Sequence, residues 1–151
     1  MISILSLNEY LAECKASFKE INRTQVLFDD STIVEFMKDH DFTHNIFMLG
    51  IIPQFDSSGT NTDNLQFNNN LAFLFVEKVD YNDLTYDQEL LVFHRTLELA
   101  KKFLLKVADE AGQSTCHEMN LIDVSSIGIN PVRNLASCNG YEVEFTLKTP
   151  I

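Results

Sequence analysis

One long amphipathic segment, Thr85–Gly112, constrains the fold of this chain most. Thr85-Tyr-Asp-Gln88 has the form of a capping box, in which two side chains satisfy free backbone N–H groups of a first helical turn. Apolar residues then recur at three- and four-residue steps, and Gly112 suits the C-terminal end. The apolar stripe contains Leu90, Phe93, Leu97, Ala100, Leu104 and Val107, widened by Leu91, Leu99 and Phe103. This pattern predicts a helix roughly 39 Å long, with a sheet on one side and a helix or partner subunit on another.

A second helix is predicted near the N-terminus. Ser6-Leu-Asn-Glu9 again has the form of a capping box. The residues behind it predict about four turns with one narrow apolar seam. The seam contains Leu7, Leu11, Cys14, Phe18 and Ile21. We interpret Cys14 as an inert core residue, because no base lies near it in the sequence and burial raises the pKa of a thiol.

Two apolar runs in the middle of the chain predict strands. Ile46–Ile52 is continuously apolar and is followed by Pro53, which indicates a strand buried on both faces that ends there. Leu71–Val79 is a second strong strand, apolar on both faces at its start. The stretch Val26–His44 stays open: it begins with a possible short strand and turn, and Ile33–Met37 fits a helical turn about as well as a strand.

The C-terminal part predicts further strands. Met119–Val124 and Ile127–Ile129 are interrupted by Ser125-Ser126, which indicates a bulge or bend. A loop over Asn134–Gly140 ends in the turn pair Asn139-Gly140. Tyr141–Leu147 then alternates apolar and polar residues, as a strand does with one face in the core and one in water.

Between the two middle strands lies Gln54–Asn70, which is rich in Asp, Ser, Gly, Thr and Asn. Such a segment has little to bury, so we predict a long mobile surface loop that reaches a neighbour as an arm. Taken together, residues 1–151 predict a single α+β domain. Its mainly antiparallel sheet packs on one long central helix and an N-terminal helix.

Candidate catalytic and metal-binding residues are few. His40 and His44 have the i,i+4 spacing of two metal ligands on a helix, but two of four ligands is a weak signal and a solvated loop is the simpler interpretation. Cys116-His117-Glu118 contains reactive types, yet adjacent side chains of a strand point to opposite faces. We therefore predict no catalytic, cofactor-binding or metal-binding residues, and a protein that is not an enzyme.

Charge and composition limit the kinds of partner that the chain is expected to bind. The chain has 11 Lys and Arg against 22 Asp and Glu, a formal net charge of −11, which disfavours nucleic-acid and anionic-membrane surfaces. No apolar run reaches the roughly 18 residues of a spanning helix, and the N-terminus lacks the pattern of a signal peptide. The 3 cysteines are widely spaced, which predicts neither a disulfide framework nor a zinc site and fits a reducing cytosol.

Three stretches resemble the tail-completion or tail-terminator proteins of tailed bacteriophages and prophages, small α+β proteins that form a ring at the head-proximal end of the tail. Leu71–Val79 resembles the family's strand before its main helix. Asp87–Lys106 resembles that helix, and Phe93–Ala100 within it is similar to a run common in phage-encoded proteins of this type. Ile127–Pro131 and Asn139–Leu147 resemble the closing hairpin of these proteins. The family has no catalytic residues to carry over.

The resemblance implies a non-enzymatic assembly protein of a phage or prophage tail or neck. Its partners would be other copies in a homo-oligomeric ring and neighbouring tail or neck proteins. It would be found in the virion and, during assembly, in the cytoplasm of the bacterial host. We expect the Gln54–Asn70 arm and an edge strand, Tyr141–Leu147, to make the contacts. Two alternatives remain: a small cytosolic binding or regulatory module that uses the apolar face of the central helix, and a metal-dependent enzyme that uses His40 and His44.

Overall fold

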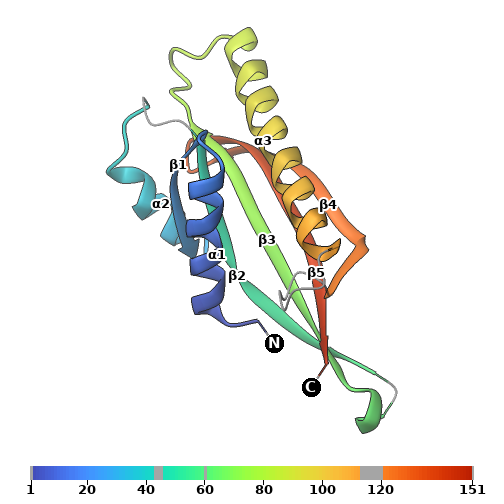
Figure 1. Cartoon of the computed structure of the whole chain (residues 1–151). Helices are drawn as coiled ribbons and strands as arrows, with labels where there is room; N and C mark the ends of the chain where they lie inside the picture. The colour runs from blue at the N-terminus through green and yellow to red at the C-terminus, as the bar shows by residue number, and fades with distance from the viewer. Residues whose placement is uncertain (1, 43–45, 60, 113–120, 151) are drawn as a thin grey trace.

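The computed structural model describes residues 2–42, 46–59, 61–112 and 121–150. Three α-helices, one short 3-10 helix and five strands follow one another in these segments (Figure 1). In chain order they are α1 (Ile4–Ser17), β1 (Ile21–Leu27), α2 (Asp30–Lys38), β2 (Ile46–Ser58), η1 (Thr62–Asn64), β3 (Gln66–Lys78), α3 (Tyr86–Gly112), β4 (Ile122–Leu135) and β5 (Cys138–Pro150).

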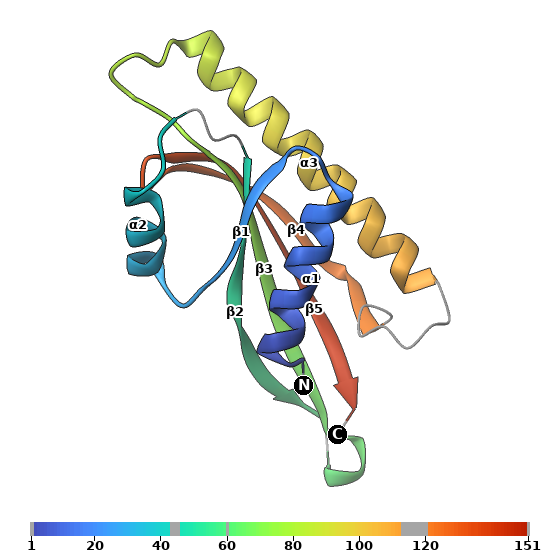
Figure 2. The ribbon, with the colours of Figure 1, turned by 60° about the vertical axis from the view of Figure 1, so that its left-hand side comes forward.

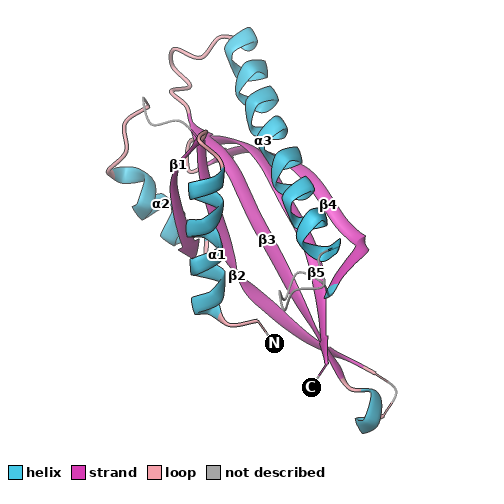
Figure 3. Cartoon of the chain, in the orientation of Figure 1, coloured by secondary structure: helices cyan, strands magenta, loops and turns pink. Residues whose placement is uncertain are grey.

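The strands form one sheet in the order β1-β2-β3-β5-β4. β1 runs parallel to β2, and every other neighbouring pair is antiparallel. Figure 3 shows this sheet behind the long helix α3 and the N-terminal helix α1. The predicted fold class, an α+β protein with a mainly antiparallel sheet packed on a long central helix and an N-terminal helix, is confirmed.

The helices cover the two faces of the sheet unequally. α1 and α3 lie on one face and share a core with β1, β2, β3 and β5, in which Phe73, Phe75 and Phe103 are fully buried. α2 lies on the opposite face (Figure 2), where Ile33 and Met37 pack with side chains of β1, β2, β3 and β5. One face therefore carries two helices, and the other is covered by α2 over only part of its width.

The central helix begins as its cap predicts. The Gln88 N–H donates to Thr85 Oγ1 at 3.3 Å, and the Thr85 N–H donates to Gln88 Oε1 at 2.9 Å. The predicted stripe is wrong in phase over the first half of the helix, because Leu90 is exposed and Leu97 is half-buried. The helix carries leucines on several sides, so the leucine pattern alone does not identify its buried face. The contact of the helix with β3 and β5 determines which side is buried. The buried residues are Val92, Thr96, Leu99, Ala100, Phe103 and Val107.

Helix α1 confirms the buried positions Leu7, Leu11 and Cys14 but begins earlier than predicted. Its N-cap is Ser3, whose Oγ accepts from the Leu5 N–H at 3.2 Å, so the predicted box that starts at Ser6 is wrong. The helix also ends earlier, since Ile21 already belongs to β1. In the open region, the helical alternative holds: α2 starts at an Asp29 N-cap that accepts from the Thr32 N–H at 3.0 Å.

The predicted long loop Gln54–Asn70 is wrong, because most of it is a β-hairpin. β2 continues past Pro53 to Ser58, and an irregularity in the register between Ile51 and Gln54 accommodates the proline. Gln54 pairs with Asn70, and the pairing then continues to the turn that contains η1. Polar composition misleads here because ladder hydrogen bonds join backbone groups and do not require apolar side chains.

Two predictions about the C-terminal strands differ from the structure. The irregularity at Ser125-Ser126 is confirmed, since the β4–β5 register shifts between Asp123 and Gly128. The turn, however, lies at Ala136 and Ser137, which have positive φ angles, and not at Asn139-Gly140. Gly140 lies inside β5, where a Cβ would overlap the carbonyl oxygen of Phe75.

The alternating strand Tyr141–Leu147 has the predicted faces, with Val143, Phe145 and Leu147 buried. Its predicted position at the sheet edge is wrong, because β5 lies between β3 and β4. Periodicity reports which face of a strand is buried and carries no information about what pairs at its two sides. The edges are β1 and β4 instead.

Candidate functional site

The β2–β3 hairpin projects beyond the two helices that cover the sheet (Figure 1). We call its outer part, residues 54–70, the hairpin arm. Its root is fixed by Asn69, a fully buried side chain of β3. Asn69 Oδ1 accepts from the Ile2 N–H at 2.8 Å, and its Nδ2 donates to the Leu147 carbonyl at 2.8 Å and to Thr149 Oγ1 at 3.0 Å. One amide thus ties the arm to the N-terminus and to β5.

The two sheet edges differ in sequence. Among the described strands, β1 pairs only with β2 and β4 pairs only with β5. From Arg23 to Leu27 the β1–β2 register is regular. β4 contains Pro131, which an edge strand tolerates where the proline nitrogen faces away from its neighbour. Its bulge leaves Val124 exposed. Each edge therefore offers only a short regular stretch for pairing with another strand.

An apolar strip lies between α3 and β4. Tyr86, Leu90, Phe93, Leu97 and Leu104 recur at steps of four, three, four and seven residues, so they share one flank of α3. Phe93 packs edge-to-face against Tyr141 of β5, with ring centroids 5.9 Å apart. The facing residues of β4 are Ile122, Ile127 and Ile129. We call this surface the α3–β4 strip.

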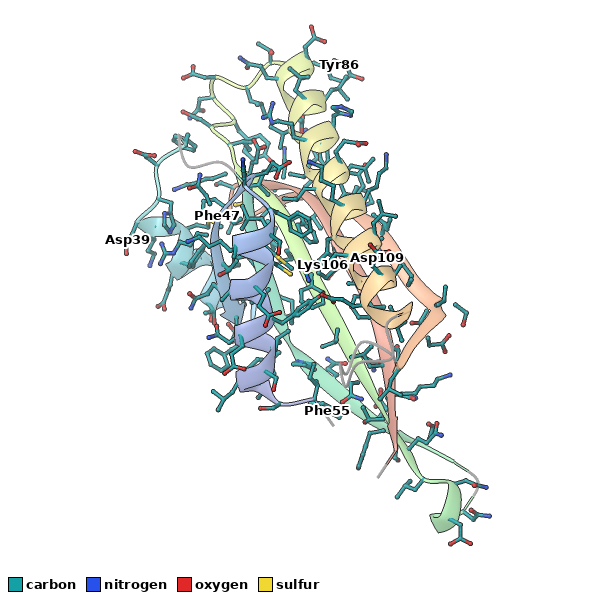
Figure 4. All side chains as sticks on the ribbon, viewed as in Figure 1. Asp39, Phe47, Phe55, Tyr86, Lys106 and Asp109 are labelled. Carbon is teal, nitrogen blue, oxygen red and sulfur yellow. The ribbon has the colours of Figure 1, made fainter. Side chains whose placement is uncertain are left out.

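Most of the α3–β4 strip is only partly covered. Tyr86 is 74% exposed and Leu90 is 49% exposed, and Figure 4 shows Tyr86 at the free end of α3. Ile129 is also exposed. α3 packs mainly over β3 and β5, so the inner face of β4 has no helix of its own above it. The sequence analysis predicted that the apolar surface of this helix would be covered by a sheet on one side and by a helix or partner subunit on another. The α3–β4 strip is an apolar surface of α3 that the sheet does not cover.

The start of α3 is held by an ion pair and by hydrogen bonds that the sequence analysis did not predict. Glu89 accepts from Arg133 Nε at 2.7 Å and from Asn139 Nδ2 at 3.2 Å, and Tyr81 donates to Asn139. The Arg133 guanidinium holds the pKa of Glu89 below its usual value. These contacts join the first turn of α3 to the β4–β5 turn, across 44 residues of sequence. A capping box can be recognised in four consecutive residues of the sequence, whereas a partner 44 residues away cannot.

A charged hollow of about 370 Å³ lies between α3, the connection into β1, the start of β2 and the end of β3. Arg95 donates to the nearly buried Glu77 through two nitrogens at 2.9 and 2.8 Å. Lys102 pairs with Glu20 from the α1–β1 connection. The cations that line the hollow are thus already neutralised by carboxylates. This arrangement fixes α3 against the sheet.

The face of β5 and β4 beyond α2 is polar. Asn70 Nδ2 donates to Asp56 at 2.8 Å, and Thr146 Oγ1 donates to Asn70 Oδ1 at 2.9 Å. Next to them on the same face, burial and the neighbouring Glu144 raise the pKa of Glu142. The polar side chains of this face are thus partly paired with one another.

The candidate metal and catalytic residues do not come together in the described structure. His40 contacts Arg23, and its ring lies tilted against those of Phe36 and Phe47, with centroids 4.9 and 5.3 Å away. His44 and the triplet Cys116-His117-Glu118 lie outside the described residues. Within residues 2–42, 46–59, 61–112 and 121–150, no three His, Cys, Asp or Glu side chains group as a metal site requires.

Both described cysteines are core residues. Burial raises the pKa of Cys14 to about 12 and that of Cys138 to about 12. Tyr10, beside Cys14, donates to Glu110 of α3 at 2.8 Å, and burial raises its pKa as well. At neutral pH these thiols remain protonated and are poor nucleophiles, as the sequence predicted for Cys14.

Comparisons with protein-family models, characterised proteins and solved structures found no match to this chain. Among the described helices, none combines the length and the apolar character needed to cross a bilayer.

Proposed function

We propose that this chain is a non-enzymatic assembly protein of a phage or prophage tail or neck, and that it forms a homo-oligomeric ring. The observation that carries the proposal is the geometry of the two sheet edges. β1 has the same direction as β2 and β5, whereas β4 has the opposite direction. A copy that continues the sheet in the same orientation therefore places its β1 antiparallel to β4 of the copy before it.

This joining is head-to-tail, because two different edges meet at each interface. Head-to-tail contacts generate a closed ring whenever the rotation between copies closes. Strand addition at an open sheet edge is a common mode of protein recognition. The corrected assignment of the edges thus retains the strand-edge contact that the sequence led us to expect, but moves it from Tyr141–Leu147 to β4 and β1.

The hairpin arm supports a second contact in such an assembly. It stands clear of the body (Figure 1), and its root is fixed by Asn69. An arm whose two strands are already paired loses less conformational entropy on binding than a disordered loop does. We propose that it reaches an adjoining copy or a neighbouring tail or neck protein. The net charge of −11 also suits a ring through which DNA passes, because DNA is repelled from an acidic surface.

Edge-blocking prolines test the ring directly. By the alternation of an antiparallel ladder, residue 129 has the same orientation as Pro131, so Ile129→Pro removes an outward N–H of β4. Of Thr24→Pro and Gln25→Pro, one removes an outward N–H of β1, and the variant that keeps the wild-type melting temperature identifies it. Size-exclusion chromatography with light scattering then gives the mass of each variant alone and of an equimolar mixture.

A head-to-tail ring predicts monomers for each variant alone and heterodimers for the mixture, since only one intact edge of each kind remains. Self-association of either variant would instead indicate an isologous contact between identical edges. A wild-type chain that is strictly monomeric at high concentration, and that binds no tail or neck protein, would overturn the proposal. Flanking genes that encode tail components would support the tail or neck location.

One observation favours a second candidate function, a small binding or regulatory module that uses the central helix. Leu90 and Leu91 are exposed on α3. A stable 1:1 complex with an unrelated cellular protein, lost in Leu90→Glu and retained in the edge-blocked variants, would favour this function over a ring.

A further inference from the structure

We infer that the α3–β4 strip is the docking surface for helix α1 of the adjacent copy. The inference rests on the proposed ring and names the elements that meet in it. The strip combines exposed side chains of α3, such as Tyr86 and Leu90, with Ile129 of β4. Side chains of this kind are normally buried when they are grouped together on one surface.

The topology specifies which element of a second copy reaches the strip. When a sheet continues through β4 into β1 of the next copy with strand directions kept, the same face of both sheets lies on the same side. α1 and α3 share one face of the sheet. Since α1 packs on β1 and β2, the α1 of the next copy must lie over the continuation of the sheet beside β4. This places it next to the exposed flank of α3.

The flank of α1 that would make this contact is the free one. Within a chain, α1 contacts α3 through Tyr10, whose ring lies edge-to-face against Phe103 at 6.3 Å. Lys106, labelled in Figure 4 on the side of α3 that faces α1, continues this contact beside Tyr10. By helical geometry, Ile4, Asn8 and Lys15 occupy the opposite flank of α1.

These free residues match the strip in kind. Ile4, Asn8 and Lys15 are all exposed, and Leu5 beside them is 76% exposed. The apolar pair Ile4 and Leu5 and the aliphatic stem of Lys15 suit a partly apolar strip. α3 would then be flanked by two α1 helices, its own on one side and that of the adjacent copy on the other. Such a contact covers Ile129 and buries side chains of α3 that the single chain leaves half-buried.

Photo-cross-linking with p-benzoylphenylalanine tests the docking surface. The probe is placed at Leu97, which is half-buried in the strip, or at Lys101, one turn further along the same helix. The Lys101 side chain is exposed and tolerates replacement. Probed copies are mixed with isotope-labelled wild-type copies, so that links between copies are recognised by mass. Val34 on α2, exposed on the opposite face of the sheet, serves as the control position.

The expected result is a dominant link between copies from position 97 or 101 to the peptide that contains residues 4–17, and none from position 34 to that peptide. An oligomer that forms normally but links these positions elsewhere overturns the docking surface and leaves the ring intact. A strict monomer without any link between copies overturns both. Circular dichroism and the melting temperature verify that each probed chain is folded.

Discussion

Replacing Asn69 with alanine should destabilise the protein strongly, although asparagine is normally a surface residue. The side chain is fully buried and makes three short hydrogen bonds, with Ile2, Leu147 and Thr149. At about 1 kcal/mol for each bond, the loss is about 3 kcal/mol. The Ile2 N–H would also lose its acceptor, which adds a desolvation penalty. For a chain of this length, about 3 kcal/mol lowers the melting temperature by about 6–12 °C.

Urea denaturation and thermal melting measure this effect, and hydrogen exchange of the Ile2 amide reports whether the N-terminus detaches. Asn68→Ala is the matched control: the oxygen of this neighbouring amide accepts from Ser58 Oγ at a longer distance, 3.3 Å, so its loss should change stability by less than about 0.5 kcal/mol. An Asn69→Ala variant as stable as Asn68→Ala would refute the assignment of Asn69 as the tie at the root of the hairpin arm. Increased exchange limited to Ile2 and the arm would locate the lost stability.

Three further predictions concern the helix cap, the open face and the core thiols. Thr85→Ala should lower the free energy of unfolding by about 1 kcal/mol, whereas Thr85→Ser should retain the cap; equal melting temperatures for both variants would contradict the capping box. Glu142→Gln should stabilise the protein at pH 7. The raised pKa of Glu142 means that folding is favoured while this carboxyl is protonated, below its unfolded value of about 4.3, and loses that stability as pH rises through the folded pKa. The gain in melting temperature should therefore shrink toward pH 4, and a gain independent of pH would count against the raised pKa. In a Cys116→Ser variant, Cys14 and Cys138 should react with Ellman's reagent only after denaturation, because burial raises the pKa of both to about 12; rapid reaction of the folded protein would show that one of them is accessible.

Local patterns predicted the central elements well, because their signals lie within a few residues. The Thr85 cap and the start of α3 follow from four consecutive residues. The alternation of β5 predicted its buried face. The bulge of β4 followed from two serines, and the Ser126 hydroxyl accepts from the Thr146 N–H at 2.8 Å within it.

Features that depend on distant pairing were not predictable from one sequence. The position of β5 in the strand order depends on its pairing with both β3 and β4, and no residue of β5 alone determines it. The hairpin arm was mistaken for a loop because its strands are held by backbone pairing and by polar contacts such as that of Asn70 with Asp56. The sequence analysis named residues 54–70 and the apolar face of the central helix as candidate contact surfaces. It did not identify β1 and β4 as the sheet edges.

Gly140 shows how a residue without a side chain can be as restricted as any in the core. It lies opposite Val76 of β3 and Val132 of β4, at a point where the Phe75 carbonyl occupies the space that a Cβ would need. Any replacement would force β5 away from β3 at this point. In a saturation mutagenesis screen, position 140 should therefore tolerate fewer substitutions than the exposed position 124, and for a reason that hydrophobicity alone would not reveal.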